Sequence, residues 1–432
     1  MSDVSFVRTE MLPEKAPPAT SVGAIGWARE NLFSGWFNTA LTLISLAVIF
    51  YVLSHILPWV LSPTWSGTSL NECREILAGA SHDGGACWGV IRERWIQLLF
   101  GFYPSELYWR PIAAFVLLGV ALAPILFSDK VPAKLLWFSA AYPFIFPWLL
   151  WGGTIWGPIA AAAGLVIGFF VYRLLSASVS GLLGLIGGVV AALIWWLLLS
   201  GLAVYALDSI LNIGLEPVES RKFGGFMLSI TIGIVAIACS LPLGIVLALG
   251  RQSDLLIVKY LCVGFIEFIR GVPLITLLFV ASTLLNIFMP PGTNFDIILR
   301  VLIMVTLFAA AYMAEVVRGG LAALPKGQYE GADSLGLTYW QAQRLIIMPQ
   351  ALKISIPGIV STFIGVFKDT TLVSIIGLLD PLGLSNAIRA DANWNGIVWE
   401  LYGFIALMFF VFCFGMSRYS MYLERKLQTG HR

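Results

Sequence analysis

The 432-residue chain is poor in charged side chains and in the residues that bind metal ions. Charged residues make up 12% of it, whereas soluble proteins average about 25%. The formal net charge is +2 and no basic stripe exists outside short loops, so we do not expect a nucleic-acid partner. The 5 cysteines and 3 histidines show no ligand spacing, so we expect no metal site and no cofactor.

Several enzyme signatures are also absent from the sequence. The chain contains no GxxxxGK[ST] phosphate loop, so we do not expect it to bind ATP by that route. It contains neither a nucleophile elbow nor an HExxH motif. We therefore predict a conduit that has no catalytic site of its own.

Long apolar runs are what the sequence has in abundance, and 59% of its residues are hydrophobic. Runs of about twenty apolar residues, each long enough to cross a bilayer as a helix, recur from Trp36 onward. The runs are continuous and do not alternate with polar residues, which favours helices over a barrel. The prediction is an all-α membrane protein with about ten transmembrane helices, or about eight if the two runs near 155–206 do not span.

The apolar runs divide the chain into four regions. Residues 1–37 are interpreted as a disordered cytoplasmic tail followed, at 27–37, by an interfacial helix, because they contain no apolar signal-peptide core. The other three regions are an N-terminal transmembrane extension at 38–222, a core of five spans at 223–418 and a second cytoplasmic tail at 419–432. In the core, the run at 255–288 is too long to be straight, and we expect a break at Gly271-Val272-Pro273.

The distribution of basic residues predicts that both termini are cytoplasmic, because short cytoplasmic loops carry an excess of Lys and Arg. The expected cytoplasmic segments contain most of the basic loop residues: Lys130, Lys134, Arg251, Lys326, Arg344, Lys353, Arg418, Arg425, Lys426 and Arg432. The long polar segment 62–110 then faces outward. It contains Cys73 and Cys87, which we expect either to form a disulfide worth roughly 3 kcal/mol or to remain two free thiols.

The longest polar interruption of the C-terminal half is the stretch 325–351, which reads PKGQYEGADSLGLTYWQAQRLIIMPQA. Its local signals predict two short helices. The first runs from about Gln328 to Leu335, and Gly336 stops it, since glycine adopts the left-handed conformation of a helix cap without steric cost. Glu330 and Asp333 are expected to point outward from this helix.

The second predicted helix begins at Thr338, with Gln341 completing a capping-box pattern. Pro349 is expected to end it. In the first helix, the small residues Gly331 and Ala332 are expected to point inward. The result is a small knob on a rigid elbow, which suits docking in a groove of another protein, although an ordinary helical loop between two spans would contain similar helices.

Five positions in this stretch have a spacing that an ordinary loop does not require: Glu330, Ala332, Gly336, Ile346 and Pro349. They fit the pattern EAA, three residues, G, nine residues, I-x-L-P. This pattern resembles the coupling loop of ABC-importer membrane subunits, which docks on the ATPase. The sequence departs from the pattern mildly, with Gly331 at the middle alanine and Met348 at the leucine.

Ionisable residues within expected spans are functional candidates, since charges in a bilayer are costly. Glu267 and Arg270, in FIEFIRGVPL, lie on one helical face and are able to pair, either along a substrate path or as a structural pair near an interface. Glu315 and Arg318, in AYMAEVVRGG, have the same spacing. They directly precede the stretch 325–351, which favours a gating or structural role.

A third polar group falls well inside an apolar run, in GVFKDTTLVSIIGL, and consists of Lys368, Asp369, Thr370 and Thr371. An amino acid zwitterion needs a cation for its carboxylate and an anion for its ammonium group. Lys368 and Asp369 supply both signs, and the hydroxyl groups are able to fix its orientation. The alternative is an ion pair that locks two helices together.

These motifs extend the resemblance over nearly the whole chain. Residues 223–425 look like the permeases of polar amino acid ABC importers, with EFIRGVPLITLLF, YMAEVVRGGLAALPKGQYEGADSLGL and FKDTTLVSIIGL as successive landmarks. In the N-terminal half, WARENLFSGWFNTALTL, CREIL, GACWGVIRERW and YPSELYWRP resemble the general L-amino-acid permease subunits, specifically the second of their two permeases. The runs near 155–206 add two spans that most members are not expected to have.

The resemblance implies a permease subunit of an ATP-driven importer for L-amino acids in a bacterial inner membrane. Its implied partners are a second permease subunit, a dimer of ATPase subunits, a periplasmic amino-acid-binding protein, the amino acid and the lipid bilayer. One alternative is a secondary transporter or channel that works alone, which predicts inverted repeats that the two halves do not show. A membrane sensor is another alternative, but the sequence contains no soluble signalling domain.

Overall fold

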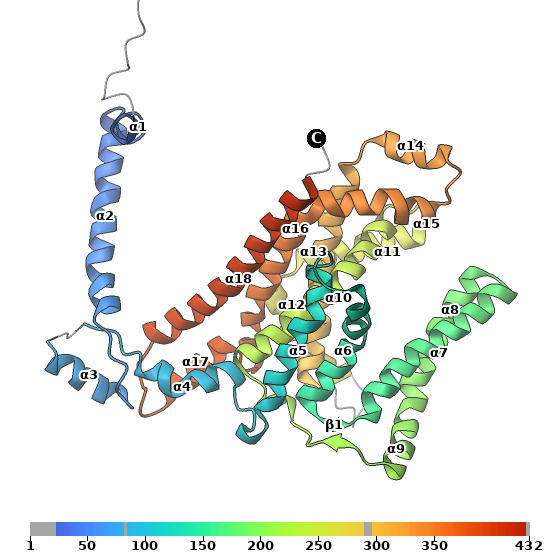
Figure 1. The fold of residues 1–432 in the computed structure, drawn as a ribbon, viewed down its shortest axis with the longest axis horizontal. Helices are drawn as coiled ribbons and strands as arrows, with labels where there is room; N and C mark the ends of the chain where they lie inside the picture. The colour runs from blue at the N-terminus through green and yellow to red at the C-terminus, as the bar shows by residue number, and fades with distance from the viewer. Residues whose placement is uncertain (1–22, 82–83, 289–295, 429–432) are drawn as a thin grey trace, which may run out of the picture. The chain divides into compact units, whose positions relative to one another are not determined.

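The computed structural model describes residues 23–81, 84–288 and 296–428, and they are almost entirely helical (Figure 1). The chain forms two compact units, residues 1–90 and 91–432. Most of the tail that was expected to be disordered, residues 1–22, lies outside the described residues.

The first unit contains two helices before its disulfide-linked segment. Helix α1 covers Gly23–Asn31 and α2 covers Trp36–Leu61. The helix expected at 27–37 is therefore interrupted, because residues 32–35 form a turn and bends that include Gly35 in an extended conformation. All of α2 is unburied within the structure, as expected for a helix that is surrounded by lipid.

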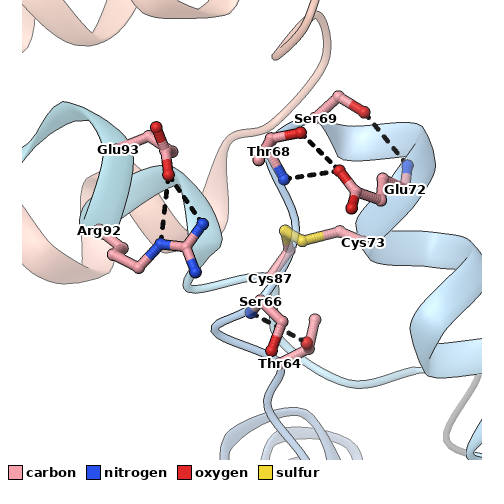
Figure 2. The surroundings of a disulfide bond; sticks show 9 residues. All are labelled: Thr64, Ser66, Thr68, Ser69, Glu72, Cys73, Cys87, Arg92 and Glu93. Atoms are coloured by element: carbon pink, nitrogen blue, oxygen red, sulfur yellow. Dashed lines mark hydrogen bonds and ion pairs between the residues drawn. A yellow bond between two sulfur atoms is a disulfide. The ribbon is translucent and has the colours of Figure 1, made fainter.

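Helix α3, Leu70–Gly79, follows in the first unit, and a disulfide between Cys73 and Cys87 connects it to the chain that leads into α4, Gly89–Phe100 (Figure 2). The Cα atoms of the two cysteines are 5.9 Å apart, and both side chains are buried. Ser69 caps α3 by accepting a hydrogen bond from the Glu72 amide, 3.2 Å away. The Glu72 carboxylate in turn accepts hydrogen bonds from the Thr68 amide and hydroxyl.

The second unit continues with helical hairpins that belong to the N-terminal extension. Helices α5, Trp109–Leu126, and α6, Leu136–Trp151, pack against each other, with short 3-10 turns at Ser105–Leu107 and Ala133–Leu135. Arg110 is fully buried at the start of α5 and donates to the carbonyl oxygens of Leu149 (2.7 Å), Glu216 (2.7 Å) and Leu150 (3.3 Å). Two of these carbonyls belong to the C-terminal turn of α6, so the guanidinium caps that helix.

A second hairpin accounts for the two additional runs. Helix α7, Trp156–Ser178, packs on α8, Gly181–Ile194, which continues through a π-helical turn at Trp195–Leu199 into α9, Ser200–Ile210. A Cβ atom on Gly168 would lie 2.9 Å from the Gly188 carbonyl oxygen, so this close approach requires glycine. Strand β1, Gly153–Thr154, pairs antiparallel with β2, Gly214–Leu215, across the open end of the hairpin.

The remaining helices form the C-terminal core. Helices α10 and α13 form the largest packing interface of this core. The two helices approach closely at Gly244 of α10, because a Cβ atom there would lie only 2.7 Å from Cβ of Met313. The elements of this region, in chain order, are a 3-10 turn at Ser220–Lys222, α10 Gly225–Arg251, α11 Leu256–Gly271, α12 Leu274–Phe288, α13 Ile297–Ala322, α14 Lys326–Ser334, α15 Tyr339–Ala342, a π-helical turn at Gln343–Ile347, α16 Met348–Asp369, a 3-10 helix at Thr370–Ile376, α17 Pro381–Ala390 and α18 Trp399–Gln428.

The number of potential spans confirms the predicted class. Among the described residues, 9 helices are long and apolar enough to cross a membrane, and 10 result if the bent pair α11 and α12 counts as one span. This pair bends by 102° at the predicted break, where Pro273 lacks the amide hydrogen that a continuous helix needs. The hairpin at 155–210 passes the same test, so the alternative of eight spans is not favoured.

A backbone junction connects the extension to the core. The chain at Gly101 forms an isolated antiparallel bridge with Phe223, and Gly224 forms a parallel bridge with Leu379. Gly101 has a φ of +70°, and a Cβ atom there would lie 2.5 Å from the Gly224 Cα atom. Three distant segments therefore meet at a point where only glycine leaves room for the backbones.

Candidate coupling loop and intramembrane charge clusters

The stretch 325–351 forms the predicted elbow of two short helices, α14 and α15 (Figure 1). Gly336 has a φ of +68°, and its amide donates to the Asp333 carbonyl oxygen at 2.9 Å. The Leu337 amide donates to the Ala332 carbonyl oxygen at 3.3 Å, which completes a Schellman motif. The predicted helix stop at Gly336 and the capping box of Thr338 with Gln341 are confirmed.

The prediction that Pro349 ends the second helix is wrong. The chain runs from α15 through the π-helical turn at Gln343–Ile347 directly into α16, in which Pro349 occupies the first turn. In the wide turn the Met348 amide donates to the Gln343 carbonyl oxygen, five residues earlier. The first turn of a helix tolerates proline because its amide hydrogens are not needed there, and the π turn supplies the transition.

The two small residues of α14 differ in burial. Ala332 is buried at 1% exposure, whereas Gly331 is exposed, so the expectation that both point inward is wrong for Gly331. Glu330 and Asp333 are exposed, as expected. On the inner face, Tyr329 packs against the apolar cluster that includes Leu324, Ile347 and Ala351, and burial raises the pKa of its phenol.

The outer surface of the elbow is unusually apolar for a polar stretch of sequence. Four large side chains are more than half exposed: Leu335 at 74%, Tyr339 at 54%, Trp340 at 71% and Leu345 at 64%. They lie on and beside the elbow that carries the exposed carboxylates of α14. A rigid, capped elbow with exposed acidic and aromatic side chains has the composition of a protein-binding surface.

The structure joins the two predicted Glu-Arg pairs into one network and adds Arg251 from the end of α10. Nη1 of Arg251 lies 2.8 Å from both Oε1 of Glu267 and Oε1 of Glu315. Arg318 contacts Oε2 of Glu315 at 2.9 Å, and Arg270 lies 3.7 Å from the same oxygen. Glu315 therefore stands at the centre of three guanidinium groups.

The direct pair between Glu267 and Arg270 is the weakest contact of this network, with 3.9 Å between the charged atoms. Arg270 instead lies over the Tyr312 ring, with its Cζ atom 5.7 Å from the ring centroid. The contribution of Arg251 was missed, because it lies 16 residues before Glu267 and 64 before Glu315, beyond any local spacing rule. Its position as the last residue of an apolar run was the only available signal.

The third polar group lies where a membrane helix changes its geometry. Helix α16 ends at Asp369, and the chain continues as a 3-10 helix from Thr370 to Ile376. Lys368 is exposed and Asp369 is half-buried. The Thr370 and Thr371 hydroxyls donate to carbonyl oxygens three residues earlier, at 2.8 and 2.9 Å.

Neither charge of this group takes part in the ion pairs found among the described residues. In the described part of the chain, no carboxylate of a second helix lies within 4 Å of Lys368. The alternative, an ion pair that joins two helices, is therefore not supported by a contact in this part of the chain. No cluster of metal-ligating side chains occurs among the described residues.

The fold is that of a multi-pass membrane protein in which a capped elbow of two short helices lies between α13 and α16. Residues 240–429 match the family described as binding-protein-dependent transport system inner membrane component. The chain is 60% identical to the glutamate/glutamine/aspartate/asparagine transport system permease protein BztC of Rhodobacter capsulatus, with 100% of both chains covered. It is 40% identical to the inner membrane amino-acid ABC transporter permease protein YhdY of Escherichia coli K12, with 97% of both covered.

The protein belongs to the family of amino-acid ABC transporter permeases and is a permease subunit of such a transporter. Among solved structures, it is similar to the crystal structure of an amino acid ABC transporter with histidines. That likeness has 30% sequence identity and a TM-score of 0.42, and it covers 46% of this chain and 91% of the other.

Proposed function

We propose that this permease imports short polar L-amino acids and takes its energy from ATPase subunits that dock on the elbow α14–α15. The observation that carries the proposal is the elbow itself, in which a Schellman stop and a capping box rigidify two helices that expose acidic and aromatic side chains. The relative BztC is named for the transport of glutamate, glutamine, aspartate and asparagine, which supports this class of cargo.

The proposed assembly contains this chain, a second permease subunit, two ATPase subunits and a periplasmic amino-acid-binding protein. In this assembly, ATP hydrolysis takes place on the ATPase chains, and this chain contributes the translocation path. Both termini are cytoplasmic, and the disulfide-linked segment of the first unit is exposed to the periplasm. The excess of Lys and Arg in the loops that would be cytoplasmic supports this orientation.

The proposed role of Lys368 and Asp369 is to receive the zwitterion. An exposed ammonium group within a span is costly unless it faces an aqueous cavity or a partner of opposite sign. Discontinuous membrane helices commonly form substrate sites, because backbone groups become available at the break. Lys368 would bind the α-carboxylate of the amino acid and Asp369 its ammonium group.

The network around Glu315 is proposed to hold α10, α11 and α13 together next to the coupling elbow. Glu267 and Arg318 are partly exposed, at 53% and 42% of their side chains, so this face does not contact lipid in the proposed assembly. A gating or structural role fits its position beside the elbow better than direct substrate binding.

The coupling role is tested with Glu330→Lys in cells that contain all subunits. We expect uptake to be lost, because the reversed charge on the exposed face prevents the ATPase from docking, while the permease remains in the membrane. The matched control is Glu219→Lys, which makes the same change at an exposed residue at the start of the core, remote in sequence from the elbow. Normal uptake by the Glu330→Lys variant would contradict the assignment of the coupling loop.

The substrate role is tested separately with Asp369→Asn. This change keeps the size of the side chain and removes its charge, so we expect at least a tenfold loss of uptake while the ATPase subunits still copurify. If the variant transports amino acids normally, Asp369 does not contact the cargo, and the coupling assignment is unaffected.

A further inference from the structure

The side-chain amide of Gln350, in the first turn of α16, makes two hydrogen bonds that cross the elbow. Its Nε2 atom donates to Oε1 of Gln328 on α14 at 2.9 Å and to the Ile346 carbonyl oxygen in the π-helical turn at 2.9 Å. Both bonds are partly buried. One amide group therefore joins α14, the π turn and α16.

The bond to Gln328 is the one hydrogen bond between α14 and α16 among the described residues. Towards the core, Tyr329 of α14 packs against an apolar cluster, and Ala332 is buried. Apolar contacts are not directional, so they hold α14 against the core without fixing its angle. A hydrogen bond fixes both a distance and a direction.

Helix α16 is in turn held to α13 near the same position. A Cβ atom on Gly320 of α13 would lie 2.5 Å from the Ala351 carbonyl oxygen and 2.0 Å from Oγ of Ser355. The two helices thus touch through their backbones next to Gln350. A displacement of α14 that is transmitted to α16 therefore moves α13 with it, together with the Glu315 network.

The far end of α16 carries the polar group at Lys368 and Asp369. The helix has 22 residues and spans about 33 Å. If the connection at the first turn of α16 is rigid, the elbow and the proposed cargo site move together as one rigid unit. A loose connection at Gln350 would allow the elbow to move without moving the cargo site.

We propose that Gln350 is a positioning residue that transmits the movement of α14 to α16, so that ATP hydrolysis is converted into transport. The proposal rests on the proposed coupling role of α14. Loss of the amide leaves the docking surface intact, because Gln350 is not on the exposed face of α14. The consequence is a transporter that hydrolyses ATP and moves less cargo in each cycle.

The test uses the complete complex in proteoliposomes and measures both ATP hydrolysis and the uptake of radiolabelled glutamate and glutamine. Gln350→Leu keeps the approximate volume and removes the donor. We expect at least a threefold fall in amino acid transported for each ATP, with the subunit composition unchanged. Gln328→Leu removes the acceptor and should give a similar fall, and the double variant should be no worse than the more affected single variant.

Two further variants separate coupling from a loss of structure. Gln350→Lys combined with Gln328→Glu restores a donor and an acceptor and should recover part of the transport for each ATP. Gln252→Leu is the matched control, since Gln252 is exposed after the end of α10 and should leave the ratio unchanged. If Gln350 and Gln328 variants keep the normal ratio, or if their effects add, the proposal is overturned. Failure of the ATPase subunits to copurify with the unmodified chain would instead overturn the proposed function.

Discussion

Lys426, in the last turn of α18, forms an ion pair with Asp129, in the hinge between α5 and α6. The Tyr419 hydroxyl of α18 also donates to the carbonyl oxygen of Leu126, the last residue of α5, at 2.6 Å. The C-terminal end of α18 and the hinge that follows α5 therefore lie at the same end of the second unit. The hinge was expected to be cytoplasmic from Lys130 and Lys134, and the C-terminal tail from its own basic residues.

This arrangement predicts the result of labelling with a membrane-impermeant maleimide. Asp129→Cys and Lys426→Cys should both react only when the reagent reaches the cytoplasmic face. Glu216→Cys, in the segment between α9 and α10, should react from the periplasm. The unmodified chain, whose Cys239, Cys262 and Cys413 lie within helices, gives the background. Labelling of position 129 from the periplasm would reverse the orientation of α5 and α6.

Substitution of Arg110 should destabilise the N-terminal extension. The buried guanidinium donates to three carbonyl oxygens, of which that of Leu150 also accepts a hydrogen bond from the Tyr103 hydroxyl at 2.8 Å. Hydrogen bonds to charged groups contribute about 1.5–3 kcal/mol each. We expect Arg110→Met to lower the free energy of unfolding by roughly 3 kcal/mol, measured by thermal denaturation in detergent. Arg110→Lys should recover little, since an ammonium group cannot reproduce the planar arrangement of donors.

The control for this prediction is Arg92→Met on α4. Arg92 is exposed, and within the described residues its ion-pair partner is Glu93 at 2.7 Å. Exposed pairs contribute about 0–1 kcal/mol. Gly152→Ala should perturb the same site, because a Cβ atom at position 152 would lie 2.6 Å from Nη2 of Arg110. Equal melting temperatures for Arg110→Met and the unmodified protein would show that the carbonyls find other donors.

Reduction of the disulfide should loosen the segment that contains α3. The Cys73–Cys87 bond closes a loop with a sequence separation of 14, for which chain entropy gives about 3 kcal/mol. We expect Cys73→Ser, or treatment with dithiothreitol, to increase proteolysis between α2 and α4 in spheroplasts. Cys239→Ser, which changes a thiol within α10, should have no such effect. Unchanged protease resistance after reduction would mean that the apolar contacts of α3 hold the segment alone.

The stability of the core should depend on pH through Asp380, the N-cap residue of α17. Burial raises the pKa of this carboxyl group to about 6 from 3.8, although the Gly383 and Leu382 amides donate to it and act in the opposite direction. Because the folded state holds the proton more tightly, the stabilisation is fully present below pH 3.8 and is lost as the pH rises to about 6.

Each pKa unit corresponds to about 1.4 kcal/mol, so the change in the free energy of unfolding over this range should be roughly 3 kcal/mol. Asp380→Asn keeps an oxygen that accepts from the same amides and cannot ionise. We expect this variant to lose the slope between pH 4 and 6 and to match or exceed the unmodified chain in stability at pH 7, as followed by thermal unfolding at several pH values. A slope that survives in the variant would belong to another group.

Most of the fold followed from local chemistry that a sequence displays. The apolar runs, the break before Pro273 and the stop at Gly336 each depend on residues within a few positions of one another. The wrong predictions concern residues whose structure depends on segments beyond their immediate neighbours. Pro349 was expected to end a helix, but the π turn before it allows the chain to continue, and the burial of Gly331 depended on what packs beside α14.

The sequence alone determined the class of protein, the approximate number of possible spans and the two short helices of the elbow, because hydrophobicity, capping and motif spacing are properties of neighbouring residues. Only the tertiary structure decided that Arg251 joins Glu267 and Glu315, that Arg110 caps α6, and that Gln350 reaches across to Gln328. These contacts connect residues that are 16 to 64 positions apart. They depend on how helices are packed, and no periodicity in the sequence records which helix becomes the neighbour of which.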